Sequence, residues 1–281
     1  MTVSEQVVAA RSELSPAEAR VAAQVLAAPS RVAFGTVAEL ARRAGTGTAT
    51  VVRFTTKAGY RGFADLQASV RAEMSESLRP AAERIREPAA RDLVDLTLHA
   101  ELDNVRATLQ GVERQAFAQA VRLLARSGRV LIAAGEASTG VARLLRDHLS
   151  MLRPAVELVR GSPVRVVSDL ATARDGDVLV ALDLRRYDRW VLDALDQAKR
   201  SGLHVVALTD GPLSPLARRA TVAFTVAAEG SGPFDSHVGE LALVNALVAG
   251  VAARLRAAAA GRLDAIESAW AAASVLAQSR P

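Results

Sequence analysis

The sequence predicts a small all-α domain followed by an α/β domain, in which a parallel five-stranded sheet is flanked by helices. Up to about residue 126, apolar residues recur mostly at the three- and four-residue spacing of amphipathic helices. From residue 129 onward, continuous apolar runs alternate with helical patterns, which is typical of parallel strands buried on both faces and covered by helices. We place the helical domain at 1–75, a linker and connecting helix at 76–110, and the α/β domain at 111–281.

The composition excludes several classes of protein. The 281 residues are 50% hydrophobic, which is enough for two domains with real cores. There is no charge-free apolar run of about 20 residues, and the first residues lack the layout of a signal peptide, so we expect a cytoplasmic protein without a membrane span. The absence of cysteine excludes disulfides, zinc ribbons and thiol nucleophiles. The net charge of +5 comes almost entirely from arginine and does not by itself indicate a nucleic-acid partner.

The first helix expected in the helical domain starts at a capping box. Ser15 and Glu18 have the spacing that satisfies free backbone donors at a helix start, and Pro16 occupies the first helical position, which suits proline. Pro29 is expected to end this helix, and a later helix is expected over 63–74.

The stretch from 36 to 62 predicts two short helices joined by a tight turn. A second capping box, between Thr36 and Glu39, starts the first of them, and Gly45 lies where a left-handed residue ends it. The second helix is expected over 48–58. This spacing is that of a helix-turn-helix motif, which presents its second helix to the major groove of DNA.

The outward face of this second helix has the chemistry that DNA reading requires. Thr50, Arg53 and Lys57 share that face, opposite the apolar Val51 and Phe54. Arginine can bond guanine edges with two hydrogen bonds, threonine can bond bases or phosphate, and lysine favours phosphate. The structural alternative is an αα-hairpin with a solvated basic face. The residues predicted to bind DNA are Arg43, Thr46, Thr48, Thr50, Arg53, Lys57 and Arg61.

Residues 16–63 resemble the N-terminal domain of the RpiR/MurR family of bacterial transcriptional regulators. The resemblance implies binding to a double-stranded DNA operator, and a dimer would let the half-site spacing mirror its two-fold symmetry. Gly47 stands where the family usually has a small polar cap of the recognition helix, and Thr46 or Thr48 can substitute for it. The matching residues are Leu14-Ser15, Leu40-Ala41, Ala49-Thr50-Val51-Val52-Arg53-Phe54, Lys57, Gly59-Tyr60 and Gly62-Phe63.

Five apolar runs predict the strands of the α/β domain, with helices before, between and after them. The strands are expected at 130–134, 155–159, 178–182, 205–208 and 222–226. The helices are expected from Asp92 and over 112–126, 140–152, 187–201, 236–260 and 262–277, after an interdomain connection over 75–91. In the helix from Asp92, the residues expected to face inward are Leu93, Leu96, Ala100 and Val105.

Ligands of such sheets bind outside the carboxyl ends of the strands. Three stretches of this sequence fall there, at 135–140, 183–188 and 209–217. In the first of them, the Ser138 hydroxyl could bind an anion together with the start of the following helix.

Residues 128 to about 228 resemble a SIS (sugar isomerase) domain, the phosphosugar-binding half of the same regulators. The resemblance rests on the Thr-Asp-x-x-x-Ser-Pro-Leu-Ala signature at 209–217 and on Phe-Asp-Ser at 234–236, before a long apolar helix. The chain departs from the family in both phosphate-binding turns. Ala134 and Glu136 replace the glycines of the first turn, and the residues that replace the hydroxyls and the glycine of the second are Asp183, Arg185, Asp188 and Arg186.

These departures leave two interpretations open. Arg185 and Arg186 can grip a phosphate or carboxylate as a guanidinium fork, in which case the ligand is a small anionic sugar derivative of modest affinity. Alternatively, both arginines form an internal salt-bridge cluster with Asp183 and Asp188, which leaves no phosphosugar site. The residues predicted to bind the ligand are Ser138, Thr139, Asp183, Arg185, Arg186, Tyr187 and Ser236.

Little in the sequence supports catalysis. The four histidines are scattered without metal-ligand spacing, so we expect neither a metal nor another cofactor. Glu240 and His237 are the only candidates for the base that a sugar isomerase needs, and a helix-start charge with a polar neighbour is the interpretation that we favour.

The hypothesis that follows is a ligand-responsive transcriptional regulator without enzyme activity. The run at 241–248 is too apolar for one face of a surface helix, so part of it should be buried against another element or subunit. We therefore expect at least a homodimer built on the C-terminal domain. The alternatives are a sugar-phosphate isomerase with an accessory helical domain, and a regulator whose SIS domain only dimerises.

Overall fold

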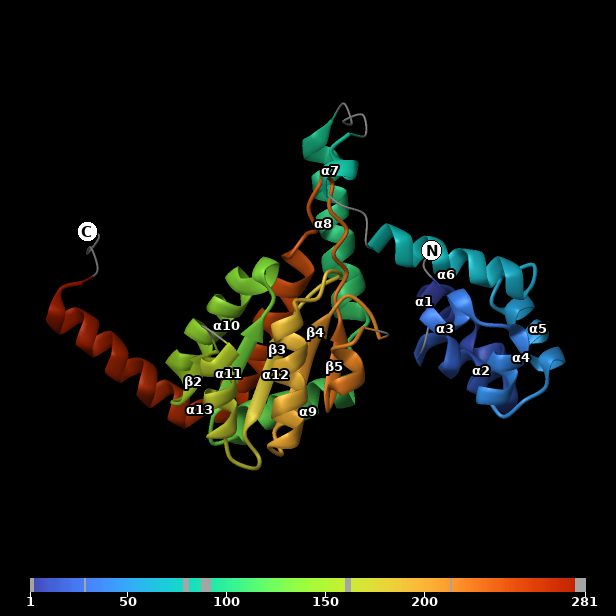
Figure 1. Ribbon diagram of the computed structural model, residues 1–281. Helices are drawn as coiled ribbons and strands as arrows, with labels where there is room; N and C mark the ends of the chain where they lie inside the picture. The colour runs from blue at the N-terminus through green and yellow to red at the C-terminus, as the bar shows by residue number, and fades with distance from the viewer. Residues whose placement is uncertain are drawn as a thin grey trace. The chain divides into compact units, whose positions relative to one another are not determined.

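The computed structural model describes residues 3–27, 29–77, 81–86, 92–159, 163–212 and 214–275. The chain folds as two compact units, residues 1–86 and 87–281 (Figure 1). Each unit has its own hydrophobic core. Part of the connection predicted over 75–91 lies outside the described residues.

The N-terminal unit is all-α, as the sequence predicts. Glu18 Oε2 accepts a hydrogen bond of 2.8 Å from the Ser15 backbone N–H, so the expected capping box starts the second helix. Pro29 begins a further helix rather than only ending the previous one, because its fixed φ suits a first helical turn. The elements are α1 (Val3–Ala9), the 3₁₀ helix η1 (Ala10–Glu13), α2 (Pro16–Ala27), α3 (Pro29–Phe34), α4 (Val37–Arg43), α5 (Thr48–Lys57), α6 (Phe63–Ser77) and α7 (Ala81–Arg84).

The core of this unit contains the helix faces that the apolar spacing predicts. Val51 and Phe54 of α5 are fully buried, and Ala58 just after the helix is also buried. They belong to one cluster with Leu40 and Ala41 of α4. This packing leaves the opposite face of α5, which carries the polar and basic residues, towards solvent.

The C-terminal unit is built on a five-stranded sheet in which every pair of neighbouring strands is parallel, which confirms the predicted fold class. The strand order is β2-β1-β3-β4-β5. Because β1, β3 and β4 are neighbours, the three stretches predicted to form a site follow adjacent strands. The strands are β1 (Val130–Ala134), β2 (Val156–Leu158), β3 (Val178–Leu182), β4 (His204–Thr209) and β5 (Val222–Thr225).

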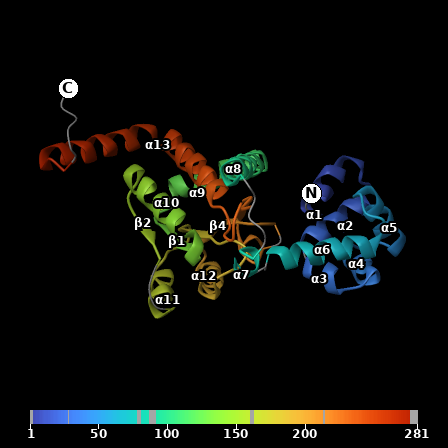
Figure 2. The same cartoon turned by 90° about the horizontal axis from the view of Figure 1, so that it is seen from above.

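Helices cover both faces of the sheet (Figure 2). Val130 and Ile132 of β1 pack with α9, α10 and α13, whereas Leu131 and Ala133 pack with α11 and α12, since successive strand residues point to opposite faces. The helix α11 is not among the predicted elements. The helices are α8 (Leu93–Gln110), α9 (Arg114–Arg126), η2 (Glu136–Ser138), α10 (Thr139–Leu152), α11 (Pro163–Ala171), α12 (Arg189–Arg200), η3 (Ala217–Arg219) and α13 (Val238–Ala273).

The rotation of α8 differs from the prediction. Leu93 and Leu96, expected to face inward, are 52% and 42% exposed, while Ala100 and Val105 are only half-buried. The buried residues of α8 are instead polar, and Asn104 is one of them.

Hydrogen bonds account for this rotation. Asn104 Nδ2 donates to the Glu229 carbonyl at 2.7 Å, and the Glu229 N–H donates back to Asn104 Oδ1 at 3.0 Å. Thr108 Oγ1 accepts from the Ala227 N–H at 3.0 Å. Buried backbone groups of the segment that leaves the sheet need such partners, so satisfying them outweighs burying the leucines of α8.

The two helices predicted at the C-terminus are joined in α13 across a kink at Arg256, where φ is 20° and ψ is −88°. Leu243, Val244 and Leu247 are buried in the core of the same chain, so the apolar run at 241–248 does not by itself require a second subunit.

Among the described residues, α13 is the one helix long and apolar enough to cross a membrane, a criterion that the core helix of a soluble protein also meets.

Candidate DNA-binding and effector sites

The turn between α4 and α5 has the local geometry that the sequence predicts. Thr36 Oγ1 accepts from the Glu39 N–H, and Glu39 Oε2 accepts from the Thr36 N–H at 2.9 Å, which completes the capping box of α4. Gly45 has the left-handed φ of 60° expected after a helix end. Gly47 is the N-cap of α5. Because glycine has no side chain to accept hydrogen bonds from the first amides of α5, these N–H groups remain able to donate to a ligand.

Arg20 of α2 hydrogen-bonds two carbonyl groups of this turn, a contact that the sequence did not reveal. Its Nε donates to the Ala44 carbonyl at 3.0 Å and its Nη2 donates to the Gly45 carbonyl at 3.2 Å. Carbonyls at a helix end lack partners within the helix, so the guanidinium satisfies them and ties α4 to α2. No local spacing signals a contact between residues so far apart in the chain.

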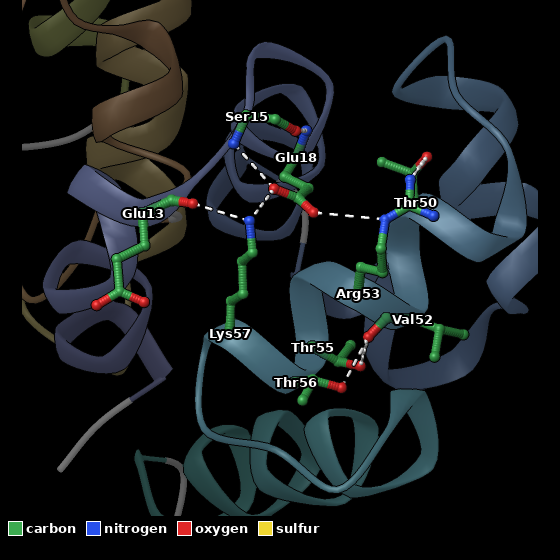
Figure 3. A network of polar contacts seen from close by, with 9 residues as sticks. All are labelled: Glu13, Ser15, Glu18, Thr50, Val52, Arg53, Thr55, Thr56 and Lys57. Carbon is green, nitrogen blue, oxygen red and sulfur yellow. Dashed lines mark hydrogen bonds and ion pairs between the residues drawn. The ribbon is translucent and has the colours of Figure 1, made fainter.

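The exposed face of α5 carries Arg53 and Thr50, as predicted (Figure 3). The Arg53 side chain is 62% exposed, and its Nη2 donates to Thr50 Oγ1 at 3.1 Å. The two predicted base-contacting side chains are therefore joined on one surface.

Lys57 lies on the same side of α5, but its ammonium contacts the chain itself. Its Nζ donates to Glu18 Oε2 at 2.8 Å and to the Glu13 carbonyl at 2.9 Å (Figure 3). The hydrogen bond from Lys57, with those from Ser15, lowers the pKa of Glu18 to about 2, so this carboxylate is charged at any physiological pH. Sequence reasoning used Glu18 only as a helix cap and missed this contact.

The other predicted DNA-binding residues differ in how exposed their side chains are. Arg43 and Thr48 are exposed. Arg61 is exposed and pairs with Asp65 at 3.2 Å. The Thr46 hydroxyl, in contrast, is buried and has no hydrogen-bond partner within the described part of the chain, so only the backbone of Thr46 is left to meet DNA.

In the C-terminal unit, the loops after β1 and β3 are joined through two carboxylates, those of Asp183 and Asp188. This residue is 3% exposed and accepts hydrogen bonds from the Leu184 N–H at 3.0 Å and the Asp188 N–H at 2.7 Å. Asp188 Oδ2 in turn accepts from the Glu136 N–H at 2.8 Å. Backbone donors of both loops thus hold carboxylates of the chain.

Asp183 has an unusual protonation equilibrium. Burial raises its pKa to about 7, the Asp188 N–H opposes the shift, and the carboxylates of Asp188 and Glu240 add to it. The group therefore changes charge close to neutral pH, unlike an ordinary aspartate.

Arg185 forms ion pairs, but not with the two aspartates that the salt-bridge interpretation names, so that interpretation is wrong about the partners. Its Nη2 pairs with the Glu229 carboxylate, and its Nη1 lies 3.3 Å from Asp235 Oδ1. Its backbone has a left-handed φ of 56°. Arg186 is exposed and makes no ion pair or side-chain hydrogen bond within the described ranges, so it is not part of a locked cluster.

The side chains of the remaining predicted ligand-binding residues do not all lie at the loops that follow β1, β3 and β4. Ser138 is buried at the end of the loop after β1, and Thr139 Oγ1 donates to the Gly135 carbonyl at 3.2 Å. The Tyr187 hydroxyl donates to Asp210 Oδ1 at 2.7 Å, which joins the loops after β3 and β4. Ser236 is different, because its hydroxyl donates to Glu101 of α8.

His237 and Glu240 form a pair at the start of α13. His237 Nδ1 lies 2.8 Å from Glu240 Oε2, and this hydrogen bond raises the pKa of His237. Burial raises the pKa of Glu240, which is 0% exposed and whose Oε1 has no hydrogen-bond partner among the described residues. Glu240 lies in the first turn of α13, as predicted, but the sequence did not predict that it is completely buried. Within the described ranges, no three side chains are grouped to hold a metal ion.

Two family models match this chain. The model of the helix-turn-helix domain of the rpiR family matches residues 1–77, and the model of the SIS domain matches residues 123–250. The two matches lie in different structural units and follow the order inferred from the motifs.

Curated relatives match both units. An uncharacterised HTH-type transcriptional regulator of Caldanaerobacter subterraneus is 22% identical over 84% of this chain and 85% of its own. The bifunctional protein glk of Burkholderia thailandensis is 28% identical over 90% of this chain, which spans only 40% of that longer protein.

Solved structures extend the similarity to the fold. The sugar isomerase domain of an RpiR transcription factor from Sphaerobacter thermophilus has a TM-score of 0.60 and 28% identity, over 63% of this chain and 99% of that one. The Vibrio vulnificus NanR protein, complexed with ManNAc-6P, has a TM-score of 0.58 over 97% of this chain and 100% of that one, at 24% identity.

Proposed function

Because this chain belongs to the RpiR family of bacterial transcriptional regulators, we propose that it binds operator DNA through its N-terminal unit and changes that binding when its SIS domain takes up a sugar-derived metabolite. It acts in the cytoplasm as a homodimer. A ligand controls such a protein only if it binds the DNA-competent and incompetent arrangements with different affinities.

The exposed face of α5 is the observation that supports DNA binding. Arg53 presents its guanidinium beside Thr50, the arrangement that reads guanine edges in a major groove. The uncapped first amides of α5 can donate to a phosphate, as helix starts do. Arg43, Thr48 and Arg61 are exposed around this face and serve as phosphate contacts.

The test is selection of duplexes from a random library with the full chain, followed by fluorescence anisotropy on the recovered site. The expected result is a recurrent sequence with two related half-sites, bound far more tightly than a scrambled duplex. Recovery of no common sequence would contradict the proposal.

The ligand of the C-terminal unit is a small anionic sugar derivative, either a sugar acid or a phosphosugar. Backbone donors of the loops after β1 and β3 already hold Asp183 and Asp188, and the same donors suit a phosphate or carboxylate. The ligand must displace these acids, which makes its affinity modest. The NanR structure with ManNAc-6P supports this class of ligand by likeness of fold.

A thermal-shift screen of sugar phosphates and sugar acids identifies the ligand, and anisotropy with operator DNA measures its effect. The expected result is a compound that raises the melting temperature and changes operator affinity in the same concentration range. A library in which no compound does either would favour a SIS domain that only dimerises.

The outer side of α8 supports a homodimer formed by the C-terminal unit. Val94, Leu98, Leu102 and Leu109 are 78%, 52%, 52% and 40% exposed, and their spacing of four, four and seven places them along one stripe. An apolar stripe of this length suits the two-fold contact of identical helices.

Isomerase activity is the second candidate, and the buried His237–Glu240 pair is the observation in its favour. We propose that the chain lacks this activity, since Glu240 is 0% exposed and has no path to a substrate proton. Incubation of aldose and ketose phosphates with the chain in D₂O tests this by NMR. Deuterium incorporation at the carbon next to the carbonyl would reverse the conclusion.

A further inference from the structure

Glu18 is a buried carboxylate next to the two cationic side chains of the DNA-reading helix (Figure 3). Its side chain is 3% exposed, its Oε2 accepts from Lys57 Nζ at 2.8 Å, and its Oε1 lies 3.7 Å from Arg53 Nε. A carboxylate this buried is costly unless it is paired, so the two cations belong to the structure of the unit as well as to its surface.

The contacts of Lys57 are those of a tie between helices. Its ammonium donates to the Glu18 carboxylate and to the Glu13 carbonyl, which joins the end of α5 to the start of α2. Moving this ammonium to a DNA phosphate would leave Glu18 without its closest cationic partner, at 2.8 Å, and that loss opposes the gain. The position of Lys57 on α5 therefore suggests a phosphate contact, but its bonds oppose one.

The contacts of Arg53 fix the direction of its guanidinium. Glu18 lies beside Nε, and Thr50 accepts from Nη2 on the other side of the group. An arginine that is already oriented loses less conformational entropy when it bonds a guanine, which favours the correct base over others.

We propose that Glu18 is a positioning residue for operator recognition, which orients Arg53 for base reading and retains Lys57 as a tie between α5 and α2. The inference rests on the proposed function, that α5 reads DNA. It assigns discrimination between sequences, rather than general affinity, to a residue that does not touch DNA.

Two effects of removing the Glu18 charge have opposite signs. Electrostatics alone predicts that losing a negative charge near the interface strengthens binding to every duplex. Loss of positioning predicts weaker binding to the operator only. Glu18→Gln separates them, because glutamine keeps the size of the side chain and its capacity to cap α2.

The first measurement compares the affinities of wild type and Glu18→Gln for the selected operator and for a scrambled duplex. We expect the ratio of the two affinities to fall about tenfold in the variant, with scrambled binding unchanged or tighter. The matched control is Asp65→Asn, which makes the same charge change beside the exposed Arg61 and should leave the ratio intact. A ratio in Glu18→Gln equal to that of wild type overturns the inference.

The second measurement uses Lys57, and it stays decisive if Glu18→Gln fails to fold. We expect Lys57→Met to lower the ratio without changing the salt dependence of scrambled binding, and Lys57→Arg, which keeps the ion pair, to restore the ratio. A salt slope that flattens by about 0.9, the contribution of one phosphate contact, would instead make Lys57 a DNA contact and overturn the inference.

These outcomes are distinct from failure of the proposed function. If wild type recovers no common sequence, α5 does not read DNA and the premise is wrong. If wild type discriminates between duplexes and both sets of variants discriminate equally well, the premise stands and the role given to Glu18 is wrong.

Discussion

Asp183 lies directly against Gly135, so closely that a Cβ on Gly135 would come within 2.3 Å of Asp183 Oδ1. The contact joins the ends of β1 and β3, where ligands of parallel sheets bind. The missing side chain of Gly135 thus makes room for an acid of the chain itself. In this protein the position between the two loops is occupied by a carboxylate that changes charge near neutral pH.

Gly135→Ala should destabilise the C-terminal unit. The new methyl group must displace the Asp183 carboxylate from its two backbone donors, which we expect to cost about 1–3 kcal/mol. Urea unfolding measures the change. The control is Gly140→Ala, at a position in α10 where a Cβ has no neighbour within 4 Å, and it should be neutral or slightly stabilising. Equal stability of the two variants would contradict this prediction.

The stability of the C-terminal unit should fall as the pH rises from about 4 towards 7. In that window the native state keeps a proton on Asp183, with a pKa of about 7, that the unfolded chain, at an ordinary value of 3.8, has released. Glu240 contributes in the same direction within this window, since burial raises its pKa, and His237, whose pKa is raised above 6.5, does so only above that pH. Asp183→Asn should therefore have a shallower decline of unfolding free energy between pH 5 and pH 8. A decline as steep as that of wild type would exclude Asp183 as its source.

Much of the architecture follows from local patterns. Continuous apolar runs predicted the first and last residues of β1 and β3 correctly. Strands that are buried on both faces contain no polar positions, so the change from apolar to polar residues marks where they end. The inward face of α5 also followed from spacing, since Val51 and Phe54 have the period of a helix.

What the sequence did not reveal depends on contacts between distant residues. The rotation of α8 is decided by hydrogen bonds from Asn104 to residue 229, which overrule its leucines. The second role of Glu18 depends on Lys57, which is 39 positions away. The partners of Arg185 are similarly remote, so spacing within the 183–188 loop suggested the wrong acids.

Arg53→Ala should weaken binding to the selected operator by about 1–3 kcal/mol and relax specificity at one base position, as loss of a two-bond contact to guanine does. Anisotropy titrations against single-base variants of the operator measure both effects. Arg122→Ala, which removes an exposed arginine from α9 in the other unit, is the control for charge and should bind as wild type does. Equal affinities of the two variants would remove Arg53 from the interface.

Replacing Leu98 and Leu102 of α8 by glutamate should convert the dimer into a monomer. Both side chains are 52% exposed on the stripe, and a buried charge at a two-fold contact is repeated in each copy. Sedimentation of the full chain at micromolar concentration measures the outcome. Val164→Glu, at an apolar residue of α11 that is 76% exposed and lies on a different helix from the stripe, is the control and should leave the dimer intact. A wild-type monomer, or a dimer that survives both charges, would place the interface elsewhere.

The last prediction concerns the three residues that we expect to hold the effector. Their side chains differ in exposure and in whether they already form ion pairs with other residues. Arg186 is exposed and outside any ion pair within the described ranges, so its guanidinium can bind an anion without first releasing an acid. Arg185 must give up Glu229 and Asp235, and Ser138 is buried. We therefore expect Arg186→Ala to weaken binding by about 1.5–3 kcal/mol, Arg185→Ala by less, and Ser138→Ala by about 1 kcal/mol.

Calorimetry of the ligand found by thermal shift, titrated into wild type and the three variants, tests this order. Binding should also tighten as the pH falls through 7 while the ligand stays ionised, because protonated Asp183 no longer repels an anion. Arg174→Ala removes an exposed arginine that precedes β3, at the amino end of the strand rather than the carboxyl end, and should bind as wild type does. Unchanged affinity in Ser138→Ala, Arg185→Ala and Arg186→Ala together would place the ligand elsewhere, because the loops at 135–140 and 183–188 carry no arginine other than Arg185 and Arg186.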